Sequence, residues 1–130
     1  MRDILFRGKV ARGHWREGEW LIGSLVIDPD DGISIYAAPV YEANGFYSMP
    51  VDPETVGQYT GISDNYGEAI CEGDRVLIDG AVDPIYTVDW YAGAFVLIAY
   101  DGDGFASEVI DFREVTSDRL TVIDNIHDRY

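Results

Sequence analysis

The sequence predicts a mainly β protein, and three observations support this. Glycine follows Asp or Asn at short intervals along the 130 residues, for example at Asp31-Gly32, Asn44-Gly45 and Asp79-Gly80. The runs between these turn signals are short and rich in β-branched and aromatic residues, which is typical of strands. The composition, 47% hydrophobic and 25% charged, is ordinary for a folded globular chain. We therefore expect many short strands joined by tight turns.

Seven candidate strands follow from this punctuation. Their ranges are 3–7, 19–27, 33–37, 75–79, 85–91, 94–100 and 120–126. In the range 19–27, side chains alternate between the two faces of the strand, and both the row that starts at Trp20 and the row that starts at Leu21 are apolar. This strand is therefore expected to be covered on both sides. The clearest hairpin joins the fifth and sixth ranges through Ala92-Gly93, because a two-residue loop ending in glycine supplies the positive φ of a tight turn.

The segment before the last strand predicts a short helix. Phe105, Val109, Phe112 and Val115 recur at steps of four, three and three, which is helical spacing. Five short elements, one of them helical, then fill the chain after the turn-rich stretch 63–73. This plan matches a small SH3-like β-barrel. The sequence thus predicts an N-terminal β-rich region over residues 1–70 and an SH3-like barrel with one short helical turn over 71–130.

The charge is strongly acidic and unevenly distributed. Nine Lys and Arg oppose 24 Asp and Glu, a net charge of −15, yet residues 1–16 alone carry +4 and leave −19 for the rest. Nucleic-acid binding rests on basic residues that displace counterions, so we expect no direct binding to DNA or RNA. The basic arm is expected to pack against the acidic body of its own chain or of a neighbouring copy.

The sequence provides no recognisable metal or cofactor motif. Cys71, His14 and His127 cannot supply a zinc cluster of the usual spacing, and Cys71 is expected to be a small packed side chain. The aspartate-rich stretches 28–32 and 101–104 lack the spacing of a calcium loop and are interpreted as hairpin turns. No run is apolar enough for a signal peptide or a membrane span, so a cytoplasmic location is expected.

No catalytic residue is predicted either. A Gly-x-Ser-x-Gly elbow is absent, and neither histidine is placed as a general base. The run Gly57–Gly61 lacks the lysine of a phosphate-binding loop. The chain has 24 Asp and Glu, so the number of carboxylates does not exclude a small hydrolase that uses a pair of them. The small size of the chain argues against such an enzyme.

Three stretches together resemble the YopX family of bacteriophage and prophage proteins. They are the opening residues 1–9 with 18–20 and 23–25, the middle run 56–62 continued by Asp64, Gly67, Ile70, 72–74 and Val76, and the ending 120–127. The middle run is the most specific. The resemblance implies a phage or prophage origin, an SH3-type barrel in the second half and no established activity, and it carries over no catalytic residue.

The most specific stretch has two interpretations. Its glycines suit turns and close backbone approaches, which indicates a structural role. Alternatively, Gln58, Tyr59 and Thr60 form an interaction loop.

These observations lead to a primary hypothesis and two alternatives. We expect a non-enzymatic accessory protein that forms homo-oligomers, with a host or phage protein as a further candidate partner. The predicted oligomer contacts are Ile4, Leu5, Phe6, Arg7 and Trp20. One alternative is an acidic decoy that imitates the charge of DNA and binds a host nucleic-acid-binding protein; the other is the small carboxylate-based hydrolase.

Overall fold

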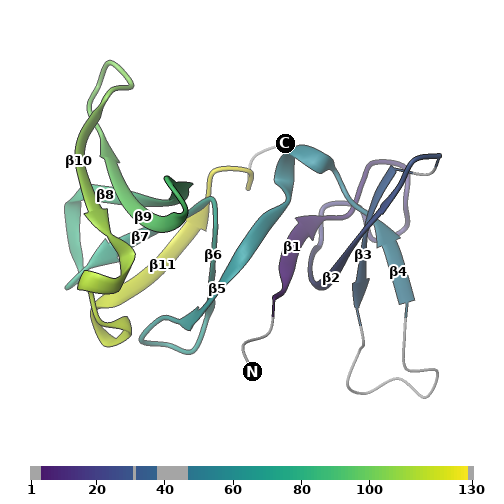
Figure 1. Ribbon diagram of the computed structural model, residues 1–130, viewed down its shortest axis with the longest axis horizontal. Helices are drawn as coiled ribbons and strands as arrows, with labels where there is room; N and C mark the ends of the chain where they lie inside the picture. Colours follow the sequence, from purple (N-terminus) through teal and green to yellow (C-terminus); the bar gives the residue numbers. More distant parts are fainter. Residues whose placement is uncertain (1–3, 31, 38–46, 129–130) are drawn as a thin grey trace. The chain divides into compact units, whose positions relative to one another are not determined.

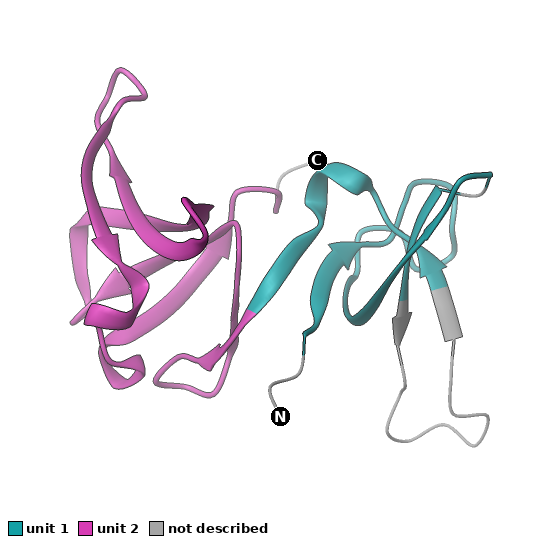
Figure 2. Ribbon diagram, in the orientation of Figure 1, with its two compact units in different colours: residues 1–59 teal, residues 60–130 magenta. Residues whose placement is uncertain are grey.

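The chain folds into two compact units, Met1–Tyr59 and Thr60–Tyr130, here called unit 1 and unit 2 (Figures 1 and 2). The computed structural model describes residues 4–30, 32–37 and 47–128. The boundary expected after residue 70 therefore lies inside unit 2.

Antiparallel strands build both units, which confirms the mainly β prediction. The strands in chain order are β1 (Phe6–Lys9), β2 (Trp20–Asp28), β3 (Gly32–Ala37), β4 (Tyr47–Pro50), β5 (Gly57–Ser63), β6 (Ala69–Cys71), β7 (Asp74–Ile78), β8 (Ala81–Tyr91), β9 (Ala94–Tyr100), β10 (Ala106–Asp111) and β11 (Leu120–Asn125). Short 3₁₀ turns lie at η1 (Pro53–Thr55), η2 (Phe112–Glu114) and η3 (Ser117–Arg119). Within the described residues no helix has the length and apolar character to cross a membrane.

Unit 1 is a sheet with the strand order β4-β3-β2-β1-β5. Its core is small and consists of the buried side chains Val10, Leu21, Ile35, Met49 and Val51. The expectation that the strand 19–27 is covered on both sides is wrong. Leu21 lies in the core, but on the opposite row Ile22 and Val26 are 40% and 44% exposed.

Unit 2 contains the larger core. Its five-stranded sheet has the order β10-β9-β8-β7-β11, and the end of β5 pairs with β6 in the same unit. The inner side of the sheet buries Ile70, Val76, Tyr86, Val88, Leu97, Ala99, Phe112 and Leu120. Closure of this sheet into a barrel stays a prediction, because the pairings run from β10 to β11 without joining these two strands in the described part of the chain.

Two tight turns connect the central strands β7, β8 and β9 of this sheet. Ala92 and Gly93 both have positive φ, 52° and 83°, as a type I′ turn requires, and Tyr91 pairs with Ala94 across it. The predicted hairpin is therefore confirmed. Asp79 and Gly80, with φ of 53° and 74°, turn the chain between β7 and β8 in the same way.

The predicted helix over 105–115 is wrong. Residues Ala106–Asp111 form strand β10, which pairs with β9 through Val109 opposite Ile98 and Ile110 opposite Leu97. A register shift between Ala106 and Glu108 interrupts the alternation that would have indicated a strand. Between β10 and β11 the chain forms the 3₁₀ turns η2 and η3, so short helical turns, not a helix, precede the last strand.

Other boundaries also differ from the sequence prediction. Strands β4, β5, β6 and β10 were not expected. The first strand begins at Phe6, and Asp3, where it was expected to begin, lies outside the described residues. Cys71 is fully buried, as expected for a small packed side chain.

Candidate functional site

Gln58, Tyr59 and Thr60 lie on strand β5 and not in a loop, which corrects the conformation expected for them. Gln58 pairs with Phe6 of β1, and the Tyr59 backbone N–H donates to the Leu5 carbonyl at 2.9 Å. Thr60 is buried, and its hydroxyl donates to the Ile70 carbonyl at 2.8 Å. Thr60 therefore holds β5 against β6, while a binding role for Gln58 and Tyr59 stays a prediction.

The predicted oligomer contacts are partly brought together in unit 1. The Arg7 guanidinium carbon lies 4.6 Å from the centre of the Trp20 ring, a cation–π distance. Phe6 packs against the unit 1 core, and Leu5 is half-buried. Ile4 alone among the five is mostly exposed, at 65%. Most of this set thus contributes to unit 1 itself.

Two buried carboxylates join the middle run to the closing strand. Asp64 accepts hydrogen bonds from the backbone N–H groups of Tyr66, Glu68 and Val122, at 2.8 to 2.9 Å. Asp74 accepts from the Cys71 N–H at 2.8 Å and from the Asn125 amide at 3.0 Å. A buried carboxylate requires such donors, so these aspartates fasten turns to β11. This supports the structural interpretation of the run.

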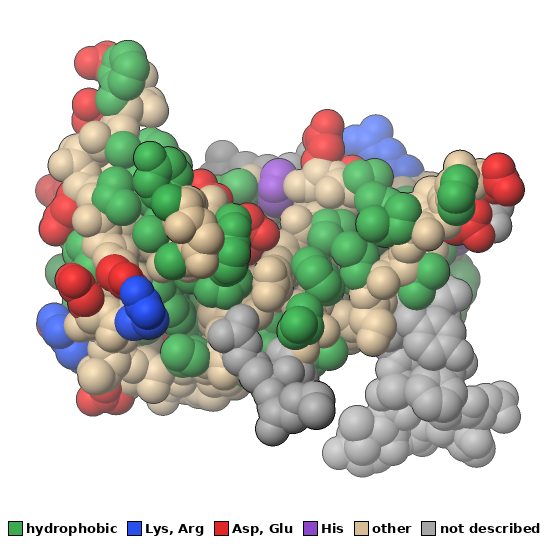
Figure 3. Space-filling model, in the orientation of Figure 1, with side chains coloured by type: hydrophobic (Ala, Val, Ile, Leu, Met, Phe, Trp, Pro, Cys, Tyr) green, Lys and Arg blue, Asp and Glu red, His purple; other side chains and the backbone are tan. Residues whose placement is uncertain are grey.

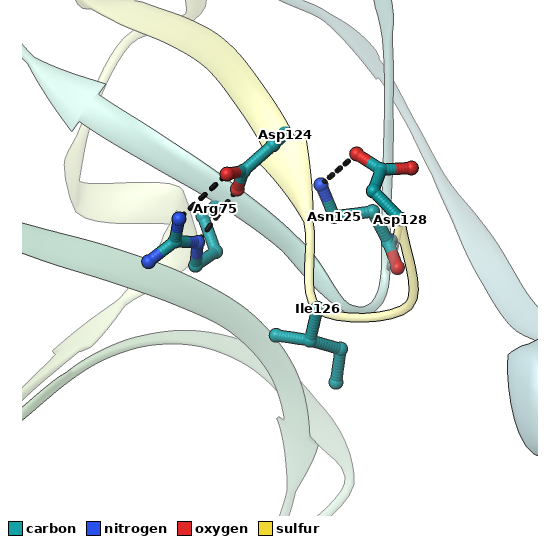
Figure 4. Close-up of a pocket in the computed structure, with 5 residues that line it drawn as sticks. All are labelled: Arg75, Asp124, Asn125, Ile126 and Asp128. Atoms are coloured by element: carbon teal, nitrogen blue, oxygen red, sulfur yellow. Dashed lines mark hydrogen bonds and ion pairs between the residues drawn. The ribbon is translucent and has the colours of Figure 1, made fainter. Parts of the chain in front are cut away.

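A polar pocket of about 390 Å³ opens at the end of β11, lined by Arg75, Asp124, Asn125, Ile126 and Asp128 (Figure 4). Arg75 donates to both Asp124 oxygens, at 2.6 and 2.5 Å, and these hydrogen bonds raise the pKa of Arg75. The Asn125 backbone N–H donates to the Asp128 carboxylate at 2.8 Å. Arg75 and Asp124 bind each other, Asp128 accepts from the Asn125 backbone, and the Asn125 side-chain amide donates to Asp74, an arrangement that secures the strand end.

The two aspartate-rich stretches are hairpin turns, as expected. Asp101 Oδ1 accepts from the N–H groups of Asp103 and Phe105, both at 2.9 Å. Asp28 Oδ1 accepts from the Asp30 N–H at 2.8 Å. Among the residues that the structure describes, no group of three or more His, Cys, Asp or Glu side chains could hold a metal ion.

The most unusual surface lies on the five-stranded sheet of unit 2. Leu97 and Ala99 of β9 belong to the core, so the alternate residues of that strand face the other way. We call this side the outer face. It is defined by Val82, Ile85, Thr87, Val96, Ile98, Tyr100 and Val109.

The outer face is apolar and partly uncovered. Val82, Tyr100 and Val109 are 72%, 49% and 52% exposed, whereas Val96 and Ile98 are buried although they stand outside the core cluster. Figure 3 shows hydrophobic side chains at the surface of unit 2 over β9 and β10, with acidic side chains among them. Apolar surface gathered in this way commonly marks a contact with another molecule.

A hollow of about 290 Å³ lies in the outer face, and Val82, Asp83, Ile85 and Tyr100 are among its lining residues. Arg75 also lines it, with its charge balanced by Asp124.

Further along the sheet, Arg113 holds the pKa of the Asp111 carboxyl at about 2 through a side-chain hydrogen bond.

Sequence reasoning missed the outer face. A signal was present, since every residue of 94–100 is apolar or aromatic, which is typical of a strand covered on both sides. In the described structure the core covers one of those sides.

Comparison with known proteins identifies the family of the chain. The family model described as YopX protein matches residues 28–129. The match confirms the resemblance of the middle run and of the ending; the opening stretch 1–25 lies before the matched residues. A search of curated proteins finds no match.

Proposed function

Because the chain belongs to the YopX family, we propose that it is a non-enzymatic accessory protein of phage or prophage type and acts as a self-associating interaction module. The observation that carries this proposal is the outer face. An antiparallel sheet usually presents a polar side to water, whereas this one presents Val82, Tyr100 and Val109. A second molecule would remove that apolar surface from water, which is the main driving force of association.

The polar groups support a structural role more than catalysis. Asp64 and Asp74 are bound by backbone and amide donors, and Arg75 is held by Asp124. Catalysis usually needs a base or nucleophile aimed into a cleft. The carboxylates described above instead stabilise turns and strand ends.

Light scattering coupled to size exclusion tests self-association. At micromolar concentration we expect a mass that is a multiple of 14.5 kDa. Val109→Asp places a charge on the outer face and should weaken association at least tenfold. Val26→Asp is the matched control, because Val26 is also a strand valine of similar exposure, 44% against 52%, but lies in unit 1.

Three results decide the proposal. Loss of association in Val109→Asp but not in Val26→Asp supports it. A wild-type mass of 14.5 kDa up to 100 μM contradicts it, as does equal weakening by both variants. Circular dichroism establishes that each variant keeps the wild-type strand signal.

The acidic decoy is a second candidate, and the charge of unit 2 favours it. Residues 60–130 contain 15 Asp and Glu against 4 Arg, a net charge of −11. Ion pairs reduce the carboxylates available for such a role, since Asp79, Asp111 and Asp124 are each bound by an arginine. Capture of a host DNA-binding protein that double-stranded DNA competes away would support the decoy; capture that DNA leaves unchanged would contradict it.

A further inference from the structure

A further pocket of unit 2, with a volume of about 380 Å³, lies on the core side of its sheet. Three of its lining residues pack against the buried core and one belongs to it, so the pocket opens onto the core. The apolar and aromatic side chains that line it are Ile78, Ala81, Pro84, Tyr86, Ile110 and Val115. We call it the core-side pocket.

The size and lining of the core-side pocket are those of a site for a small ligand. Such sites typically have volumes of about 300 to 1,000 Å³, apolar walls that bind the body of the ligand, and a few polar groups that orient it. The core-side pocket has the apolar walls, and two charged residues, Glu114 and Arg119, complete its lining.

The charge left in the core-side pocket is negative. Arg119 donates to both carboxylate oxygens of Asp79, at 2.7 to 3.1 Å, so its charge is balanced. The Glu114 carboxylate has no hydrogen bond or ion pair within the described part of the chain. Its neighbour Arg113 donates to both oxygens of Asp111 instead, and the pKa of Arg113 is raised first by Asp111 and least by Glu114. Glu114 is therefore the charged group that a ligand could pair with.

A second carboxylate lies next to the wall of the pocket. The Tyr86 hydroxyl donates to Glu108 at 2.8 Å. Burial, and then this hydrogen bond, raise the pKa of Tyr86, so the hydroxyl keeps its proton at neutral pH. No basic side chain binds Glu108 among the residues that the structure describes, so its charge adds to that of Glu114. Apolar walls under a negative potential favour a ligand with an apolar body and a positive end.

We propose that the core-side pocket binds small organic cations in which an apolar chain or ring carries an ammonium group. The apolar part contacts Ile78, Ile110 and Val115, and the ammonium group lies beside Glu114. A neutral compound of the same shape would contact the same walls but leave Glu114 unpaired, and an anion would be repelled. The site is separate from the proposed self-association, because it lies on the side of the sheet opposite to the outer face.

Three probes of equal chain length test this chemistry: n-hexylammonium, 1-hexanol and hexanoate. Each is titrated into the isotope-labelled wild type at pH 7, and amide chemical shifts are followed. We expect saturable shifts at Ile78, Ile110 and Val115 in the millimolar range, because so small a ligand gains little binding energy. Ile98, on the outer face, should not shift. Hexylammonium should bind about threefold more tightly than hexanol, the effect of one partly exposed ion pair, and hexanoate more weakly than hexanol.

Three variants separate the contributions of charge and shape. Glu114→Gln should weaken hexylammonium about threefold and leave hexanol unchanged. Asp118→Asn is the matched control, because Asp118 is also an exposed carboxylate of this segment but does not line the pocket. It should leave the preference for hexylammonium over hexanol in place. Ala81→Phe puts a ring into the pocket from an exposed position and should weaken hexylammonium and hexanol alike, at least fivefold. An amide spectrum that otherwise matches the wild type establishes that each variant is folded.

Two outcomes would overturn the proposal. Hexylammonium that binds no more tightly than hexanol would show that Glu114 does not select a cation. Equal weakening of hexylammonium by Glu114→Gln and Asp118→Asn would assign the preference to the net charge of the chain.

One further probe distinguishes a free amine from a lysine side chain of a partner protein. Binding of Nα-acetyl-lysine methylamide more tightly than hexylammonium supports the same pairing with Glu114 and identifies the ammonium group as that of a lysine. Weaker binding of this probe supports a free amine, because the lysine stem carries two polar amides that the apolar walls do not accommodate.

Discussion

Asp74 and Asn125 are 51 residues apart in the sequence, and the Asn125 side-chain amide donates to Asp74 Oδ1 at 3.0 Å inside unit 2. Asp74 is fully buried, and its second oxygen accepts from the Cys71 backbone N–H at 2.8 Å. One carboxylate thus joins the start of β7 to Cys71 at the end of β6 and to Asn125 at the end of β11. These contacts connect the middle run to the ending, two of the three stretches that carry the family resemblance.

Asp74→Asn should destabilise the protein strongly. Each Asp74 oxygen serves a different donor, so an amide NH₂ in place of one oxygen leaves a buried N–H without an acceptor. We expect a loss of about 2–4 kcal/mol in the free energy of unfolding. Urea unfolding followed by circular dichroism at a fixed protein concentration measures it.

Asp101→Asn is the matched control for this substitution. Asp101 also accepts two backbone hydrogen bonds, but both reach the same oxygen, Oδ1, which asparagine retains, and the residue is exposed. Its cost should stay below about 0.5 kcal/mol. Equal costs for the two substitutions would show that the Asp74 contacts are not what holds β11.

Ala92→Asn should stabilise the β8–β9 hairpin. Ala92 has a φ of 52°, a left-handed conformation that costs an alanine about 1–2 kcal/mol and an asparagine less. Asn-Gly is also the preferred pair for a type I′ turn. We expect a gain of about 0.5–1 kcal/mol in the same urea experiment. Ala106→Asn, on the exposed part of β10, should instead be neutral or destabilising, because asparagine is disfavoured in strands.

Local signals explain what the sequence predicted correctly. The Ala92-Gly93 hairpin depends on two adjacent residues and the apolar strands beside them, so residues close together in the sequence are enough to predict it. The misassigned helix shows the opposite case. Phe105, Val109 and Phe112 have helical spacing, but β10 gains its hydrogen bonds from β9, and the bulge after Ala106 hides its alternation.

The candidate site needed contacts that local patterns do not contain. The glycines around Gln58 suggested a loop, yet β5 is stabilised by pairing with β1, about 50 residues earlier in the chain. An all-apolar run such as 94–100 indicates that both faces of a strand are covered, but it does not identify what covers each face. The outer face became visible only once Leu97 and Ala99 were placed in the core.

The ion pair between Arg113 and Asp111 should give a measurable pH dependence. The pKa of Asp111 is about 2 in the folded protein, below its ordinary 3.8, chiefly because of the Arg113 side chain. The stabilisation is therefore complete above pH 4 and is lost as the pH falls from 4 to 2. In Arg113→Gln the carboxyl should titrate closer to 3.8, and the stability difference from wild type should shrink over that window.

Carboxyl carbon chemical shifts report this titration directly. Arg119→Gln serves as the control, since Arg119 binds Asp79 and lowers the pKa of that carboxyl by a hydrogen bond, whereas Asp111 is bound by Arg113. It should move the Asp79 titration upward and leave that of Asp111 in place. An Asp111 midpoint that is unchanged in Arg113→Gln would assign the low pKa to the backbone N–H of residue 113 instead.

Gly73→Ala should cost more than Gly67→Ala, although both glycines have a left-handed φ, 92° and 84°. At Gly67 an added Cβ meets nothing within 4 Å, so only the backbone conformation is penalised, by about 1–2 kcal/mol. At Gly73 the Cβ would lie 3.0 Å from the Asn125 amide nitrogen, which its bond to Asp74 prevents from moving away. We expect an additional cost of about 1–3 kcal/mol from this overpacking. In a double-mutant cycle, Asn125→Ala should remove the overpacking at residue 73. The double mutant should then lose about 1 kcal/mol or more less unfolding free energy than the sum of the two single mutants. Equal costs at the two glycines, or strict additivity with Asn125→Ala, would show that the amide yields and that the close approach at Gly73 contributes little to the fold.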